Sequence, residues 1–177
     1  MTTRDYLIDV AASKLGDYRK GSREVEAIWR DVLPESWTNK QVEQYAATKD
    51  WCGGFVLHCL REARLTDVRW KDGGGFVIPL LGYASVTKTP RPGDIGIRVG
   101  PKGKEVYHHF LVVNWDGPHG WGSIDGNTPT CARKHHTSLD PTTVFYSIEK
   151  LLPELPEAGF SAEDPFAVPG VQEPKGE

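Results

Sequence analysis

Residues 50–64 read DWCGGFVLHCLREAR, and they contain the strongest helical pattern of the chain. Apolar or small side chains recur from Cys52 at spacings of three and four: Cys52, Phe55, Val56, Cys59, Leu60 and Ala63. Such spacing places these side chains on one face of an amphipathic helix. We therefore predict a helix over residues 52–64 that packs this face against the core.

Cys52 would occupy the first turn of that helix. Unpaired backbone N–H groups and the helix macrodipole stabilise a thiolate there, and the thiolate is the nucleophilic form of cysteine. Gly53 and Gly54 follow at once, although glycine costs about 1 kcal/mol relative to alanine inside a helix. Close approach of a substrate backbone to the sulfur would explain them. The alternative is that Cys52 is a buried apolar residue at a helix start, as we expect for Cys59.

The rest of the chain separates into a helical first half and a β-rich second half. Further helices are predicted at residues 3–15, 22–33 and 38–47. Strands are predicted at residues 95–99, 106–115, 122–125 and 143–148. Helices followed by an antiparallel sheet define an α+β domain over residues 1–152. Residues 153–177 form a Pro-rich acidic tail with little to bury.

Composition excludes several classes of protein. The chain has 177 residues, 38% of them hydrophobic and 25% charged, as expected for a soluble globular domain. Its apolar runs are shorter than the ~20 residues of a membrane span, and residues 1–16 lack the apolar core of a secretory signal. The net charge of −3 disfavours nucleic-acid binding. Three cysteines cannot all pair, so we expect reduced thiols.

Two histidines open the strand predicted at residues 106–115. Side chains alternate between the faces of a strand, so only one of His108 and His109 is expected to face Cys52, and the alternation leaves open which one. Asp125 and Asn127 flank Gly126 and share one face of an extended segment. Either one could accept the second imidazole N–H, which would give the triad of a thiol hydrolase. The alternative is a turn, because Asp-Gly-Asn is typical turn chemistry.

Other polar and aromatic residues give weaker signals. Trp51, Trp70 and Trp121 would line a substrate groove or lie in the core. The chain has no C-x-x-C and no H-E-x-x-H pattern, and Cys131, predicted in a loop, matches no metal template with His135 and His136. We therefore expect no metal and no cofactor.

Four segments in order resemble motifs of the CHAP and NlpC/P60 superfamily of papain-like cysteine hydrolases. They are WCGGFVLHCLREA at 51–63, RPGDIGI at 91–97, HHFLVV at 108–113 and SIDGNT at 123–128. The segment VAASKLG at 10–16 is similar to the first helix of phage lysins of this kind. The resemblance covers residues 5–150 and implies a papain-like fold, with N-terminal helices packed on an antiparallel sheet.

The resemblance also implies roles for single residues. Cys52 matches the nucleophile, His109 matches the base because the aliphatic run begins just after it, and Asp125 matches the acid that orients the base. Asn127 matches the polar residue beside that acid. Substrate contacts are expected from Trp51, Gly53, His108 and Trp121.

The chain departs from the family pattern at three places. Asp125 stands where Glu is usual, so Asn127 remains a second candidate for orienting the base. His108 replaces a small residue, which leaves open a shift of the base by one position. The D-x-D-x-D-G calcium loop of some relatives is absent from the sequence, so we expect no calcium.

The function implied is hydrolysis of bacterial peptidoglycan by an N-acetylmuramoyl-L-alanine amidase or an endopeptidase, through a thioester intermediate. We expect a monomer that is made in the cytoplasm without a signal peptide and reaches the wall by holin-dependent release or through a secretion machine. Two alternatives remain. One is an inactive wall-binding or phage structural module, and the other is an effector that hydrolyses a non-wall amide.

Overall fold

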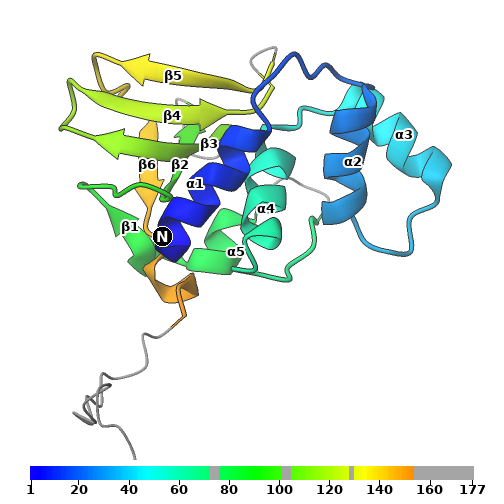
Figure 1. The fold of residues 1–177 in the computed structure, drawn as a ribbon, viewed down its shortest axis with the longest axis horizontal. Coiled ribbons are helices and arrows are strands. Elements are labelled where there is room, and N and C mark those ends of the chain that lie inside the picture. The colour runs from blue at the N-terminus through cyan, green and yellow to red at the C-terminus, as the bar shows by residue number, and fades with distance from the viewer. Residues whose placement is uncertain (72–75, 101–104, 128–129, 154–177) are drawn as a thin grey trace, which may run out of the picture.

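The computed structural model describes residues 1–71, 76–100, 105–127 and 130–153. Its helices are α1 (Thr3–Ser13), α2 (Arg23–Val32), α3 (Asn39–Thr48), α4 (Cys52–Glu62) and α5 (Val77–Leu81), with 3₁₀ turns η1 (Tyr83–Ser85) and η2 (Glu149–Leu151). Its strands are β1 (Val86–Thr87), β2 (Ile95–Val99), β3 (Val106–Trp115), β4 (Trp121–Asp125), β5 (Ala132–His136) and β6 (Thr143–Tyr146). The strands pair antiparallel in the order β1-β6-β2-β3-β4-β5, which confirms the α+β class (Figure 1).

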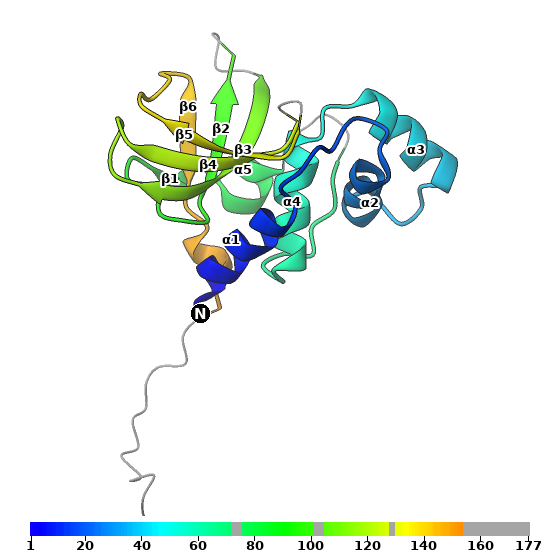
Figure 2. The ribbon, with the colours of Figure 1, turned by 45° about the horizontal axis from the view of Figure 1, so that its top comes forward.

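Helix α4 lies between the sheet and the α2–α3 pair in both views (Figures 1 and 2). Its central position explains the two glycines at its start. A Cβ added at Gly53 would lie 2.7 Å from the indole of Trp70, and one added at Gly54 would lie 3.0 Å from the indole of Trp29. Both distances are too short for packed carbon atoms. The space beside Gly53 and Gly54 is therefore filled by tryptophan rings, which corrects the expectation that Gly53 leaves room for substrate.

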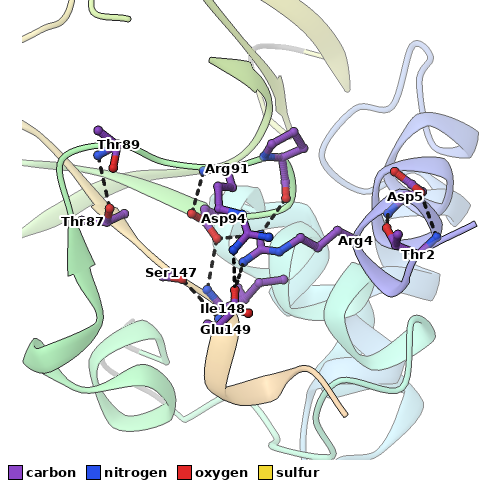
Figure 3. Close-up of polar contacts among 11 residues, drawn as sticks. Thr2, Arg4, Asp5, Thr87, Thr89, Arg91, Asp94, Ser147, Ile148 and Glu149 are labelled. Atoms are coloured by element: carbon purple, nitrogen blue, oxygen red, sulfur yellow. Dashed lines mark hydrogen bonds and ion pairs between the residues drawn. The ribbon is translucent and has the colours of Figure 1, made fainter. Parts of the chain in front are cut away.

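A buried ion pair joins the first helix to the entry of β2 (Figure 3). Arg4 Nη1 donates to Asp94 Oδ1 at 2.8 Å, and Arg4 Nη2 lies 3.0 Å from Glu149 Oε2. Asp94 also accepts the backbone N–H groups of Arg91 and Ile148, at 2.8 and 3.2 Å. Asp94 is 1% exposed. The network thus fixes α1, the start of β2 and η2 to one another.

The sequence prediction missed three elements. Strand β5 has the sequence ARKHH, which lacks the apolar alternation of a half-buried strand, and it lies at an edge of the sheet. Helix α5 has five residues and β1 only two, so neither gives a periodic signal. The predicted tail at 153–177 lies, beyond residue 153, outside the described residues. None of the described helices combines the length and apolarity needed to cross a membrane.

Candidate functional site

Cys52 is the first residue of α4, as predicted. Helices α1, α2 and α3 each begin with a side chain that accepts a backbone N–H, from Thr2, Ser22 and Thr38 respectively. At the start of α4, Trp51 supplies no such acceptor. The partial positive charge of this helix terminus therefore acts on the Cys52 thiol without competition from a capping side chain.

Both histidines of β3 act on Cys52, because hydrogen bonding and positive charge from His108 and His109 lower the pKa of its thiol. The prediction that only one of them faces the sulfur was wrong. Arg98 of β2 pairs with His108, but the next residue, Val99, pairs with Val106, so Tyr107 is an extra residue on β3. Such a bulge increases the local twist and re-aims the side chains beside it.

Asp125 pairs with His108 and not with His109. His108 Nε2 lies 2.7 Å from Asp125 Oδ2, and the two side chains are 11% and 1% exposed. Asp125 lies opposite Phe110 on the neighbouring strand, so it shares a sheet face with Phe110 and His108. His109 instead stacks on Phe76, with ring centroids 5.5 Å apart. The expectation that Asp125 orients His109 is therefore corrected to His108.

This pairing determines which nitrogen of His108 serves Cys52. An ionised carboxylate only accepts hydrogen bonds, so His108 Nε2 is the N–H that donates to Asp125. Nδ1 is the nitrogen left for the sulfur. It accepts the thiol proton when the imidazole is neutral and donates to the thiolate when it is charged.

The ionised forms of Cys52, His108 and Asp125 stabilise one another. Burial disfavours ionisation of Cys52, but hydrogen bonds and positive charge from His108 and His109 outweigh it and lower the pKa of the thiol to about 6. Burial likewise opposes the charge on His108, whereas Asp125 and Cys52 raise its pKa to about 9. Burial raises the pKa of Asp125, but hydrogen bonds from His108 and Ser123 outweigh this effect and leave the pKa below its ordinary value. The two shifts, downward for Cys52 and upward for His108, favour a thiolate–imidazolium pair near neutral pH.

Three residues that the sequence analysis did not assign to the site surround Asp125. Ser123 Oγ hydrogen-bonds to Asp125 Oδ1 and lies 2.9 Å from His136 Nε2. Lys134 Nζ lies 3.4 Å from Asp125 Oδ2. Ser123 could have been found from its place two residues before Asp125 on one strand face. Lys134 and His136 lie on β5, whose sequence gave no strand signal.

Among the described residues, Asn127 hydrogen-bonds to neither histidine. Its φ of 61° lies in the left-handed region, and its Nδ2 donates to Asp50 Oδ1 at 2.9 Å. Lys20 Nζ reaches the same oxygen at 2.7 Å. Gly126 lets the end of β4 approach α4 closely, since an added Cβ would lie 2.8 Å from Phe55. Asn127 therefore joins the end of β4 to Asp50, in the segment before Cys52, and is not placed to orient a base.

The tryptophans predicted as substrate contacts lie in the core. Trp51 is 0% exposed and Trp121 1%. Trp51 packs edge-on against Phe55, and Trp121 stacks on His136 with centroids 3.7 Å apart. Both rings are therefore packing residues, which corrects the expectation for Trp51 and Trp121. His108, also predicted as a substrate contact, is the histidine that lies between Cys52 and Asp125.

The other two cysteines are buried thiols of a different character. Burial raises the pKa of Cys131 to about 12 and that of Cys59 well above its ordinary value. Cys59 is 0% exposed and belongs to the core, as predicted. Cys131, predicted in a loop, forms an isolated bridge with Gly16 next to β5. Within the described part of the chain, Cys52 is the only thiol with a histidine that lowers its pKa.

Searches with protein-family models, among curated proteins and among solved structures give no match for this chain. Across the described ranges, no three His, Cys, Asp or Glu side chains form a group that could hold a metal ion. What the site can do therefore follows from its own geometry. That geometry is a nucleophile at a helix start, an imidazole beside it and a buried carboxylate behind the imidazole.

Proposed function

We propose that this chain is a cysteine hydrolase that cleaves amide bonds through a thioester on Cys52. The observation that carries the proposal is the order Cys52, His108, Asp125, with a buried carboxylate 2.7 Å from the imidazole. This is the arrangement of a nucleophile, a general acid–base and an orienting acid.

The reaction follows from the charges. The Cys52 thiolate attacks the amide carbonyl and forms the C–S bond, and the oxyanion of the tetrahedral intermediate is stabilised by backbone N–H at the start of α4. His108 Nδ1 gives its proton to the leaving amine as the C–N bond breaks. The neutral imidazole then takes a proton from water, whose oxygen attacks the thioester. The C–S bond breaks, and the thiolate and imidazolium are restored.

His109 has a supporting role in this scheme. It lowers the pKa of Cys52 from the side of β3 that faces α4, where its Nδ1 lies beside Gly53. Among the described residues, no carboxylate hydrogen-bonds to it. It stabilises the thiolate and holds the sulfur in place. The role of general base, which the sequence resemblance gives to His109, is therefore proposed for His108.

For the substrate we propose bacterial peptidoglycan. The four motif segments that resemble CHAP and NlpC/P60 hydrolases support it, as does the α+β architecture with its nucleophile at a helix start. The bond would be the amide between the sugar and the first alanine, or an amide within the stem peptide or cross-bridge. A papain-like fold, a monomeric state, and release through a holin or delivery by a secretion machine belong to the same proposal.

The test is mass spectrometry of soluble fragments from purified peptidoglycan incubated with the wild type, Cys52→Ala and Cys131→Ala. We expect new fragments with the wild type and Cys131→Ala, and none with Cys52→Ala. Fragment masses distinguish an amidase from an endopeptidase. An absence of fragments with every wall type would favour a non-wall amide if Cys52 is alkylated rapidly, and a binding module if Cys52 is inert.

A further inference from the structure

Both oxygens of the Asp125 carboxylate have polar partners. Those of Oδ1 form a chain of hydrogen bonds that extends away from Cys52. Oδ2 faces His108 at 2.7 Å and Lys134 at 3.4 Å. Oδ1 accepts from Ser123, and Ser123 lies 2.9 Å from His136. Ser123 is 0% exposed, so no solvent competes for its hydroxyl. A continuous polar chain thus runs from β5 through β4 to β3 and ends at Cys52.

The direction of every hydrogen bond in this chain can be derived. A serine hydroxyl has one proton, and a carboxylate has none to give, so the Ser123 proton lies toward Asp125. Ser123 Oγ can then only accept from His136, which makes His136 Nε2 an N–H. This holds whether His136 is neutral or charged. The order of donors is therefore the same in both charge states.

We infer that Ser123 and His136 are positioning residues that fix the rotation of the Asp125 carboxylate, and through it the ring orientation of His108. The inference rests on the proposed cysteine chemistry of Cys52. Without the bond from Ser123, Oδ1 would be a buried acceptor with no donor, and the carboxylate would be free to turn away from His108. Trp121, stacked on His136 at 3.7 Å, holds the outer end of the chain.

The closing experiment measures alkylation of Cys52 by iodoacetamide in the full chain between pH 5 and 9, by peptide mass spectrometry. A less firmly held Asp125 stabilises the His108 imidazolium less, so less thiolate forms. We expect Ser123→Ala to move the acid limb of the alkylation profile upward by about one pH unit, which is about tenfold in rate on that limb. Lys134, Arg98 and His135 also face this region, and they stay unchanged in every variant.

Two variants of His136 separate positioning from packing. His136→Gln keeps an N–H close to the position of Nε2, and His136→Phe keeps a ring to stack on Trp121 but has no donor. We expect Gln to keep the wild-type profile and Phe to move it as Ser123→Ala does. Unmoved profiles in Ser123→Ala and His136→Phe would overturn the inference. So would a defect in Gln that Phe lacks.

A measurement on the wild type alone is independent of how the variants fold. Nitrogen-15 NMR of the histidine rings reports the tautomer, and we expect His136 protonated at Nε2 at pH 8. An Nδ1–H tautomer of His136 would overturn the inference. A failure of the proposed function appears elsewhere, as peptidoglycan fragments that do not depend on Cys52 or as no fragments at all. Neither result changes the tautomer or the alkylation comparison.

Discussion

Two aspartates of this chain are equally buried but have different partners. Asp94 and Asp125 are each 1% exposed. Asp94 is bound by the guanidinium of Arg4 and by backbone N–H groups. Asp125 is bound by His108 and Ser123. Both carboxylates are satisfied, so burial and hydrogen bonding alone do not tell a structural aspartate from a catalytic one.

The two aspartates differ in whether their hydrogen-bond partners can release a proton. A guanidinium and a backbone amide keep their protons in proteins, so the Asp94 network only holds elements together. An imidazole exchanges its proton near neutral pH, and His108 stands between Asp125 and a thiol. In the proposed mechanism, the neighbours of a buried carboxylate thus decide whether it is structural or catalytic.

Exchanging each aspartate for asparagine gives the largest expected contrast. Asp125→Asn should lower kcat/KM on peptidoglycan by about 10³- to 10⁴-fold, as loss of the orienting acid does in other triads. Asp94→Asn should lower the free energy of unfolding by about 3 kcal/mol, because Arg4 keeps a buried charge with less compensation. Turbidity assays and urea unfolding measure the two effects. A large loss of activity in folded Asp94→Asn would contradict the proposal that Asp94 is structural and Asp125 catalytic.

The two histidines sharpen the comparison within the site. His108→Ala should lower kcat by about 10³-fold, the size of a general acid–base contribution. His109→Ala removes one hydrogen bond to the thiolate and should cost about tenfold. Steady-state kinetics on solubilised peptidoglycan compares them directly. The reverse order would restore His109 as the base, as the sequence resemblance implied.

The pH profile tests the ion pair itself. The pKa of Cys52 is lowered to about 6 and that of His108 is raised to about 9, so kcat/KM should be level between these values. Below about 6 the thiolate takes up a proton, and above about 9 His108 has none for the leaving amine. The stability that His108 gains from the pair is complete below its ordinary pKa and is lost as the pH rises through about 9.

Asp125→Asn supplies the control for this profile. Removing the carboxylate takes away the partner that stabilises charged His108, so the alkaline limb should move to lower pH and the plateau should narrow. Alkylation of Cys59 and Cys131 serves as an internal reference, because burial raises the pKa of both thiols. Equal profiles for the wild type and Asp125→Asn would contradict the thiolate–imidazolium pair.

The parts of the site that could be predicted from the sequence are those with a periodic pattern of apolar residues. Cys52 at the start of α4 and the strand that begins near His108 follow from apolar spacing. The choice between His108 and His109 does not, because it depends on which histidine meets Asp125 across the pairing of β3 with β4. Ser123 and His136 were not predicted either, since their connection depends on the pairing of β4 with the polar edge strand β5.

The smallest expected effect concerns Asn127, which sequence reasoning placed beside the base. Asn127→Ala loses the hydrogen bond to Asp50 and puts a Cβ-bearing residue without a polar side chain at φ 61°, so it should cost about 1 kcal/mol of stability and a few-fold in kcat. Asn127→Gly loses the same bond without the backbone cost. It should therefore match Ala in activity and exceed it in stability, measured by urea unfolding and turbidity assays. A loss of 10²-fold or more in both variants, near that expected for Asp125→Asn, would show that Asn127 orients the base after all.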